Sequence, residues 1–494
     1  MLRLRWVRIK SYRSLAGDTE LSFGRGAVFV LGRNASGKTT LLDLFANLIA
    51  CRLAPFLDED EPVDIEWELE WEEAEDRAPD VLRLHLAVEH GASPAPRVGD
   101  DLGGASVQGA MMGQQRPAAR WTLEGELRSP TPQSGLALEG SAWVLGKWPE
   151  DQPWPPLHFS FAWDRQPDFD PLLELSTSGA KLPPSPFAPP SPFDSGFLMN
   201  LAGHLLWRRH REEGRPQIAF EHGIAIQRLA RSLPHSLDRF DEALGVFNAI
   251  VDAPDRQGPV AEILYNHRAG LGIRFVPEPL RLRLSRFSEE RDAIPATERD
   301  SNPPELSFTV NKKDIPPSSP DPFDQIVETL EADQLDVRPR LLEQEANGNV
   351  VWRGFDFYVR WPGGVKHRHT QLSFGQKRIL AFLWYAAVFD KVPLLTDELT
   401  NGFHNAWARQ LTDLLADRQV FHAIQNPLLL DKTGPGPVEE LPGRFILCSA
   451  DVGESGRREW RWRNPTAREA KRLRKAWDTD IQQLSQVLLS EGLW

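Results

Sequence analysis

The chain has 494 residues, 41% of them hydrophobic and 26% charged, which allows about two to four globular domains and excludes a fibrous or disordered protein. Its formal net charge of -13 argues against a protein that coats nucleic acid by bulk electrostatics. The two cysteines exclude a disulfide framework or a cysteine zinc site, so any metal must have oxygen ligands. The longest apolar run, 379–389, is far shorter than the roughly 20 residues that span a bilayer, and the N-terminus lacks a signal-peptide core, so we expect a cytoplasmic protein.

The first fifty residues predict a strand, a phosphate-binding loop and a helix. After a strand-like stretch at 3–15, residues 27–32 (AVFVLG) are apolar, as in buried parallel strands. The following GRNASGKTT matches G-x-x-x-x-G-K-[ST], and an apolar helical face begins right after it, which makes a chance match in a glycine-containing turn the weaker reading. Such a loop turns backbone N–H groups around a phosphate at a helix N-terminus. The expected nucleotide-binding residues are Gly32, Arg33, Asn34, Ala35, Ser36, Gly37, Lys38, Thr39 and Thr40, with Lys38 on the β- and γ-phosphates and Thr39 on Mg²⁺.

The middle of the chain predicts an antiparallel sheet followed by a long inserted region. Residues 63–72 alternate apolar and acidic side chains, and 81–90 and 120–127 alternate similarly, so basic and acidic outer residues can pair across strands. A proline-rich connector begins near 181 and a mostly helical region spans 196–250. Without a heptad run this region is not a coiled coil, and we expect a folded insertion.

Two further motifs lie near residue 400. LSFGQ places Ser373, Gly375 and Gln376 at the start of a helix, which makes a second anion site, although an ordinary N-cap would also explain the serine. A short strand then leads to Asp397 and Glu398, which suit a metal ligand and a general base, respectively. A solvated loop start is the alternative for these two carboxylates. Because one chain binds one nucleotide at the first motif, two phosphate-binding helix ends predict a head-to-tail dimer in which each LSFGQ meets the other subunit's nucleotide.

The C-terminal part is basic. Residues 457–475 carry nine Arg or Lys and two Glu, a net charge of +7, which leaves -20 on the rest of the chain. Thr466 can cap one helix whose apolar stripe runs from Ala470 to Leu488. Tryptophans among the basic residues suggest a DNA-binding patch at Arg472, Arg474 and Lys475, and the alternative is a solvated helix face packed on an acidic neighbour.

The motifs GRNASGKTT, LSFGQ and LLTDE, in this order, resemble the Walker A, signature and Walker B motifs of ABC-type ATPases. IKSYRSL and DELTNGFH resemble the cytosolic branch with RecF, the structural-maintenance-of-chromosomes (SMC) heads and the OLD-family ATPases, often called AAA family ATPases. The resemblance implies an α/β P-loop NTPase fold of ABC-ATPase type, with a mixed sheet flanked by helices, an antiparallel β subdomain and a large α+β insertion between Walker A and signature. It also implies ATP and Mg²⁺ as cofactors, and Arg13 near a nucleotide phosphate, where a surface arginine is the alternative.

The expected domains are four. They are an N-terminal ATPase lobe with Walker A and the antiparallel subdomain at 1–180, an inserted and partly helical region at 181–345, a C-terminal ATPase lobe with signature and Walker B at 346–432, and a basic strand and helix segment at 433–494.

The strand after Walker B departs from the family pattern, in which a histidine at its end senses the γ-phosphate. In RQVFHAIQNP we expect His422 within the strand and Gln425 at its C-terminal edge. A glutamine can donate to a phosphate oxygen but cannot carry a proton, so we expect a sensor without acid–base function and slow hydrolysis. The alternative is an amide that caps the strand end structurally. Thr396 and Pro393 are further departures in the Walker B strand.

The resemblance favours ATP hydrolysis that drives dimerisation in DNA repair or anti-phage defence, together with a separate effector such as a nuclease. An ATP-locked sensor or scaffold with little turnover is the non-catalytic alternative. An ABC transporter subunit is less favoured, because 331 residues separate Thr40 from Leu372, a much longer span than transporters have. A nuclease within this chain is not expected, because the residues after the ATPase core contain no carboxylate cluster for two metals.

Overall fold

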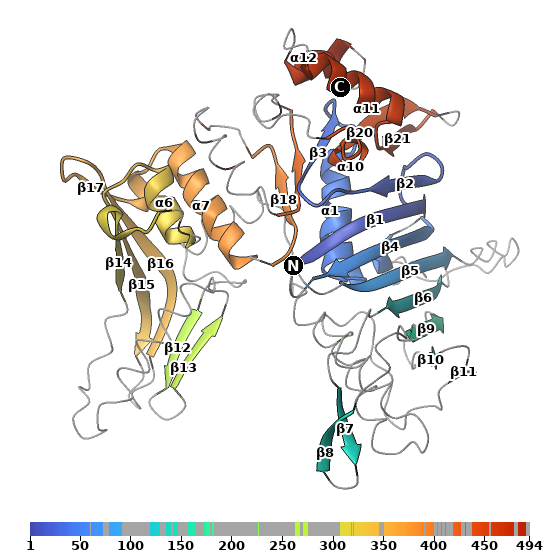
Figure 1. Ribbon diagram of the computed structural model, residues 1–494, viewed down its shortest axis with the longest axis horizontal. Helices are drawn as coiled ribbons and strands as arrows, with labels where there is room; N and C mark the ends of the chain where they lie inside the picture. Colours follow the sequence, from blue (N-terminus) through green and yellow to red (C-terminus); the bar gives the residue numbers. More distant parts are fainter. Residues whose placement is uncertain are drawn as a thin grey trace, which may run out of the picture.

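The computed structural model places two β-rich lobes beside a central sheet (Figure 1). It describes residues 1–72 without 60, 79–90, 119–128, 135–139, 142–146, 157–164, 172–177, 180–181, 226, 262–266, 270–274, 307–344 without 318 and 320, 350–399 without 390, 403, 407, 411, 418–425, 430, 437–478 without 454 and 455, and 483–490. The predicted connector at 181–195 and nearly all of the helical region expected at 196–250 lie outside these residues.

The central sheet has five strands in the order β18-β19-β3-β20-β21. The first four strands are parallel and β21 is antiparallel, so the sheet is mixed, as expected. Parallel strands covered on both faces need continuous apolar runs, and β3 is buried along five of its six residues. The bounds are β3 (Ala27–Gly32), β18 (Leu394–Asp397), β19 (Val420–Ala423), β20 (Phe445–Val452) and β21 (Arg458–Arg463), with helix α1 (Lys38–Ile49) after β3 and α10 (Leu441–Arg444) before β20.

Strands β20 and β21 come from the segment predicted to form a separate C-terminal unit at 433–494. Because β20 pairs directly with β3, this segment completes the central sheet instead of appending to it. The pairing joins residues more than 400 positions apart, which no local pattern reveals.

An eight-stranded antiparallel sheet packs beside the central sheet, as the alternating segments predict. Its order is β11-β10-β9-β6-β5-β4-β1-β2, and its inner face shares one hydrophobic core with α1. The bounds are β1 (Leu2–Ser11), β2 (Thr19–Ser22), β4 (Val63–Trp71), β5 (Asp80–His90), β6 (Ala119–Arg128), β9 (Leu157–Asp164), β10 (Leu172–Thr177) and β11 (Ala180–Lys181), while β7 (Gly135–Glu139) and β8 (Ala142–Gly146) pair with each other.

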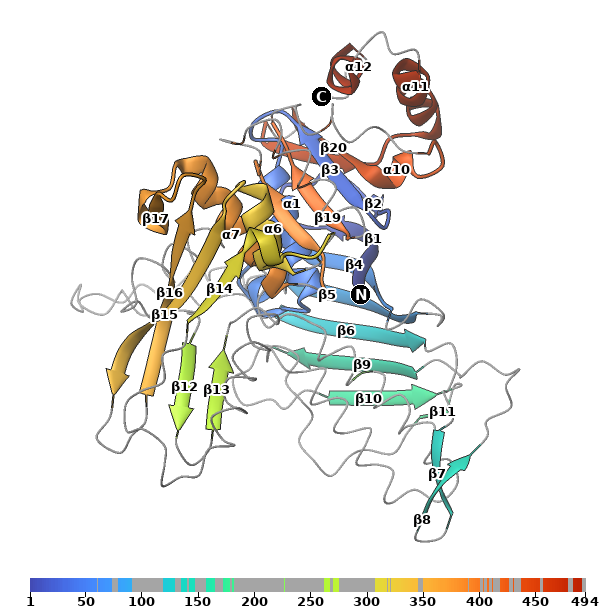
Figure 2. The same cartoon turned by 60° about the vertical axis from the view of Figure 1, so that its left-hand side comes forward.

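A third sheet forms the other lobe and carries the helix that follows LSFGQ (Figure 2). Its order is β13-β12-β16-β15-β14, with β17 on β16, and it packs on helices α6 and α7. The boundary predicted at residue 345 falls between β15 and β16, two strands that pair along their length, so this sheet spans the predicted insertion and the C-terminal lobe. The bounds are β12 (Glu262–Asn266), β13 (Gly270–Arg274), β14 (Phe308–Asn311), α6 (Pro322–Thr329), β15 (Gln334–Gln344), β16 (Val350–Arg360), β17 (Lys366–Arg368) and α7 (Phe374–Val388).

The C-terminal residues form two helices, α11 (Ala467–Asp478) and α12 (Leu484–Ser490), where the sequence predicted one. Thr466 caps α11 as expected, because its Oγ1 accepts from Glu469 N at 3.3 Å while Glu469 Oε2 accepts from Thr466 N at 2.7 Å. Both helices bury residues of the predicted apolar stripe in a third core against β3 and β20, namely Ala470, Leu473, Leu484 and Leu488.

A buried amide joins the central sheet to the antiparallel sheet. Gln419, just before β19, accepts from Leu4 N and donates to Leu4 O and Gly24 O, each at 2.9 Å. All polar atoms of this side chain are therefore satisfied by the backbone of the neighbouring sheet. No helix within the described residues is long and apolar enough to cross a membrane.

Candidate nucleotide-binding site

The loop after β3 has the backbone that its glycines permit. Gly37 precedes α1 with φ 83°, in the left-handed region that favours glycine. Gly32 has φ 154°, and a Cβ there would lie 2.2 Å from Cys448 O. Both positions therefore need glycine. Gly37 needs it for its φ, and Gly32 needs it for its close approach to β20.

Lys38 and Ser36 turn polar groups into this loop. Lys38 is 6% exposed, and its Nζ donates to Gly32 O at 2.6 Å and Arg33 O at 3.1 Å, while burial lowers the pKa of its ammonium. The Ser36 Oγ is buried and has no hydrogen-bond partner among the described residues. A phosphate in the loop would give both groups an acceptor, so these residues fit a nucleotide.

Thr39 and Asp397 are in contact. Asp397 is the last residue of β18, and its Oδ2 accepts a hydrogen bond of 2.8 Å from Thr39 Oγ1 at the start of α1. The structure thus brings Walker A together with Walker B across 358 positions of the sequence. A hydroxyl and a carboxylate this close are oxygen ligands that suit Mg²⁺, whose remaining ligands are usually water and phosphate oxygens.

Glu398 and Gln425 follow neighbouring strands at the same edge of the central sheet. Glu398 is half-buried, has φ 50°, and donates its N–H to Ala423 O at 2.8 Å. Gln425 comes two residues after Ala423, where β19 ends, and is exposed. α/β proteins bind ligands at the carboxyl edge of their parallel strands, and both residues lie at this edge.

His422 lies inside β19 and is paired. Its Nδ1 is 2.6 Å from Thr396 Oγ1, the polar residue in the Walker B strand, and its ring stacks on Phe29 at 5.7 Å. The two unusual polar residues of β18 and β19 therefore satisfy each other within the sheet.

The signature residues open α7. The Ser373 hydroxyl accepts from Gln376 N at 3.4 Å, and Gln376 Oε1 accepts from Ser373 N at 2.9 Å, a capping box. Ser373 is exposed and Phe374 is 62% exposed, whereas Gly375 is buried. Helix α7 packs in the core of the third sheet and α1 in that of the antiparallel sheet, so the two helix ends that are predicted to bind phosphate belong to different cores.

Arg13 is bound to an acidic side chain. Its Nη2 donates to Glu59 Oε1 at 2.7 Å, and its guanidinium lies 5.1 Å from the centre of the Tyr12 ring. Arg13 also has φ 48°, so the turn that follows β1 holds it in a left-handed conformation.

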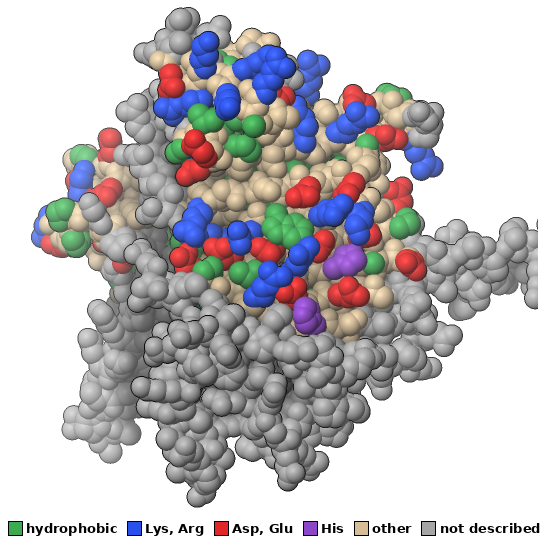
Figure 3. All heavy atoms as spheres, turned by 45° about the vertical axis from the view of Figure 1, so that its right-hand side comes forward, with side chains coloured by type: hydrophobic (Ala, Val, Ile, Leu, Met, Phe, Trp, Pro, Cys, Tyr) green, Lys and Arg blue, Asp and Glu red, His purple; other side chains and the backbone are tan. Residues whose placement is uncertain are grey.

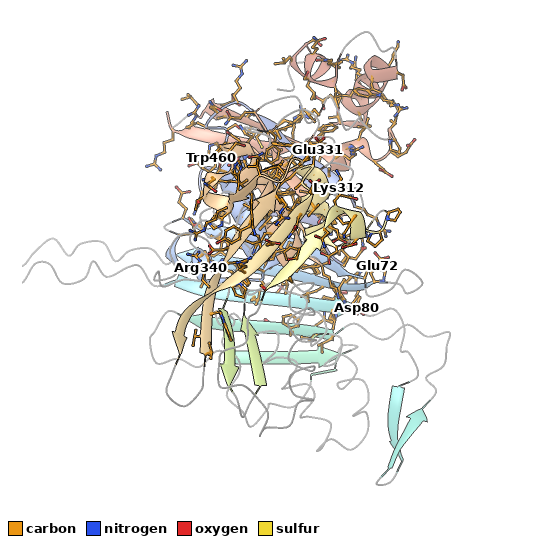
Figure 4. The ribbon with its side chains drawn as sticks, turned by 90° about the vertical axis from the view of Figure 1, so that its left-hand side faces the viewer. Glu72, Asp80, Lys312, Glu331, Arg340 and Trp460 are labelled. Atoms are coloured by element: carbon orange, nitrogen blue, oxygen red, sulfur yellow. The ribbon has the colours of Figure 1, made fainter. Side chains whose placement is uncertain are left out.

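Two tryptophans of β21 belong to the site, although the sequence suggested a nucleic-acid surface for them. Trp462 Nε1 donates to Ser36 O at 3.2 Å, and a Cβ at Gly37 would lie 2.8 Å from the ring of Trp460, labelled in Figure 4. The two indoles stack at 5.9 Å. The alternation in REWRWR marks their shared strand face, but nothing local indicates that this face meets the P-loop.

Two residues of the predicted DNA patch are exposed on α11, namely Arg472 and Lys475. The third, Arg474, is partly buried and donates from Nε to Asp478 Oδ2 at 3.0 Å. Arg474 therefore differs from Arg472 and Lys475, because its side chain is partly buried and hydrogen-bonded to Asp478.

Among solved structures, SMC head domains are similar to this chain, at low sequence identity and low TM-scores. No family model matches the chain, and no curated protein matches it. The SMC head described as bound to the C-winged helix domain of ScpA is similar at 10% identity and a TM-score of 0.37, covering 93% of this chain and 98% of that one. The SMC head domain from Thermotoga maritima is similar at 11% identity and a TM-score of 0.33, over 93% and 98% of the two chains. A head domain derived from Pyrococcus furiosus, bound to the C-terminal domain of ScpA, is similar at 10% identity and a TM-score of 0.33, over 97% and 98%.

Proposed function

We propose that this chain binds ATP with Mg²⁺, hydrolyses it slowly, and uses the nucleotide to join two copies head to tail. The contact between Thr39 Oγ1 and Asp397 Oδ2, beside Glu398, carries this proposal. It supports a P-loop nucleotide site, because it joins the start of α1 to the end of β18 at the carboxyl edge of the parallel strands of the central sheet.

In this proposal each residue has a distinct task. Residues 32–40 surround the phosphates, with Lys38 on the β- and γ-phosphates, and Thr39 and Asp397 hold Mg²⁺, which neutralises charge on the phosphates. Glu398 orients the attacking water and accepts its proton. Gln425 donates an amide N–H to the γ-phosphate, and because an amide cannot carry a proton, we expect slow turnover.

The dimer is proposed from the exposed signature. Ser373 and Phe374 present a polar and an aromatic side chain at the start of α7, and a helix N-terminus attracts the γ-phosphate. A second copy that supplies its P-loop nucleotide to this surface would bury both groups. We further propose, from the motif resemblance, a role in DNA repair or anti-phage defence with a separate effector such as a nuclease.

ATP turnover and oligomeric state test the proposal together. We expect Glu398→Gln to lower steady-state turnover by about 100-fold or more and to accumulate an ATP-dependent dimer in size-exclusion chromatography with light scattering. Glu20→Gln, which removes an exposed carboxylate on β2, is the control and should behave as wild type.

Equal turnover in wild type and Glu398→Gln would reject the enzyme and leave the ATP-locked scaffold, the alternative function. In the same assays Gln425→His should change turnover if Gln425 senses the γ-phosphate. If turnover and dimerisation stay unchanged, Gln425 is a structural amide at the strand end.

A further inference from the structure

The signature helix carries a buried arginine that binds the backbone of the Walker B turn. Arg378 lies in the second turn of α7 and is 6% exposed. Its Nη2 donates to Glu398 O at 2.9 Å and to Asp397 O at 3.3 Å, while its Nε donates to Leu399 O at 3.1 Å. One planar guanidinium therefore binds three consecutive carbonyl groups, which fixes the path of the turn.

These bonds hold Glu398 in a conformation that it would not adopt unaided. A non-glycine residue at φ 50° is strained, so the surroundings must maintain this conformation. The Glu398 N–H is held by Ala423 O, and its carbonyl group is held by Arg378. The direction of the Glu398 carboxylate therefore depends on a side chain of the signature helix.

Helix α7 is attached to the Walker B strand at a second point. Two turns after Arg378, the Tyr385 hydroxyl accepts from Leu395 N at 3.2 Å. Helix and strand also share a hydrophobic core, to which β18 contributes Leu394. A displacement of the start of α7 must therefore move the turn at 397–399 or break the Arg378 bonds.

We propose that Arg378 is a positioning residue that couples the docking of the signature onto a second copy's nucleotide to the placement of Glu398 in its own site. The inference rests on the proposed head-to-tail dimer. There, the signature and Glu398 of one subunit serve different nucleotides, so this side chain makes hydrolysis at each site depend on occupancy of the other. Such a link is a coupling free energy between two sites, carried by one hydrogen-bonded contact.

Arg378→Lys tests the proposal against a closely matched control. Lysine keeps the positive charge, but its ammonium cannot reproduce the planar fork across three carbonyls. Arg418 makes the same kind of contact at the other end of α7, where it donates to Ala386 O, Phe389 O and Val392 O, and none of these three acceptors lies in the turn at 397–399. We therefore expect Arg418→Lys to loosen α7 while the three bonds of Arg378 to this turn remain.

We expect Arg378→Lys to lower kcat about tenfold or more and to leave the KM for ATP within about twofold, because the catalytic carboxylate is misplaced while the P-loop is untouched. Arg418→Lys should retain wild-type kcat. In a Glu398→Gln background both variants should still dimerise with ATP. Equal kcat values in the two lysine variants would overturn the proposal.

Hydrogen exchange supplies a test that does not depend on the Arg378 variant folding. In Glu398→Gln protein, amides of 394–399 should exchange more slowly once ATP drives dimerisation, and Ser373→Arg, which blocks docking, should abolish this slowing. Unchanged exchange on dimerisation would overturn the coupling and leave the ATPase intact. A wild type that neither dimerises nor hydrolyses ATP would instead reject the proposed function itself.

Discussion

At the level of single residues, the pair formed by Thr396 and His422 explains how polar side chains are tolerated in the central sheet. The two residues are 0% and 4% exposed and lie opposite each other in the pairing of β18 with β19. Their contact of 2.6 Å replaces the hydrogen bonds that water would make, which offsets the cost of burying them.

The same pair predicts a pH-dependent stability. Burial lowers the pKa of His422 to about 3, whereas an unfolded histidine titrates near about 6.5. Between these values the unfolded chain binds the extra proton, so the stabilisation is complete above about pH 6.5 and is lost as the pH falls towards the folded pKa. The loss amounts to about 1.4 kcal/mol per pH unit within that window.

Urea unfolding from pH 7.5 to 4.5 measures this effect, with His422→Gln as the reference that cannot titrate. We expect the wild-type midpoint to fall more steeply with decreasing pH than that of the variant, since all other titrating groups are common to both chains. Parallel pH dependences would show that His422 does not carry the effect.

Sequence motifs locate individual site residues only where the chemistry is local. Lys38 and Thr39 follow from the glycine spacing of one short loop, and Asp397 follows from a strand that ends in carboxylates. The contacts of Arg378 with the Walker B turn depend instead on how α7 lies against β18, and the indole of Trp462 reaches Ser36 across 426 positions. Neither contact leaves a periodic or compositional trace in the chain.

At the level of elements, β21 is hydrogen-bonded both to the P-loop and to the turn after β1. Trp460 N donates to Ser14 O and Ala16 N donates to Trp460 O, both at 2.8 Å. The same strand also contacts the P-loop, because Trp462 Nε1 donates to Ser36 O. A strand near the C-terminus thus fixes two N-terminal loops of the candidate site.

Trp462→Phe removes this bond and keeps an aromatic ring in the core. Loss of one neutral hydrogen bond costs about 1 kcal/mol, so we expect the KM for ATP to rise about fivefold with little change in kcat. Trp477→Phe, on α11 and packed in the third core, is the matched control. A KM equal to that of the control would show that β21 does not shape the P-loop.

Periodicity identified several elements correctly and failed where an element ends or changes partner. The alternation of β4 and β5 predicted an antiparallel sheet, because one face of each strand is apolar. A continuous apolar stripe predicted one helix capped by Thr466 and ending near Gly492, but the chain forms two helices, α11 and α12, since a stripe records burial and not continuity of the backbone.

At the level of the whole molecule, opposite charges are paired on the antiparallel sheet, whereas basic side chains outnumber acidic ones in the C-terminal segment 457–475. The outer face of that sheet mixes basic and acidic side chains, whereas Lys and Arg side chains gather at the end with the C-terminal helices (Figure 3). Arg5 pairs with Glu68 of β4 at 3.2 Å, and Arg3 pairs with Glu72, directly after β4, at 3.0 Å, so cations of β1 offset acidic side chains of the neighbouring strand.

Helix α11 has an exposed basic face. Its members share the helical spacing i, i+3, i+4 and i+7 and are exposed, namely Arg468, Lys471, Arg472 and Lys475. If this face bound a duplex, each phosphate that one of these cations neutralised would release counterions, so the affinity would depend on the salt concentration. The predicted DNA patch consists of Arg472, Arg474 and Lys475; of these, Arg472 and Lys475 lie on this exposed face, whereas Arg474 is partly buried and pairs with Asp478.

A double charge reversal, Arg472→Glu with Lys475→Glu, tests whether this face binds DNA. We expect duplex affinity at about 50 mM salt to fall at least tenfold and the slope of log K against log salt to shrink by about two, because two phosphate contacts are lost. Lys312→Glu with Lys313→Glu makes the same change in net charge on the exposed turn after β14 and serves as the control. If both double variants weaken binding equally, net charge alone governs the affinity, and the α11 face is a solvated surface without a nucleic-acid partner.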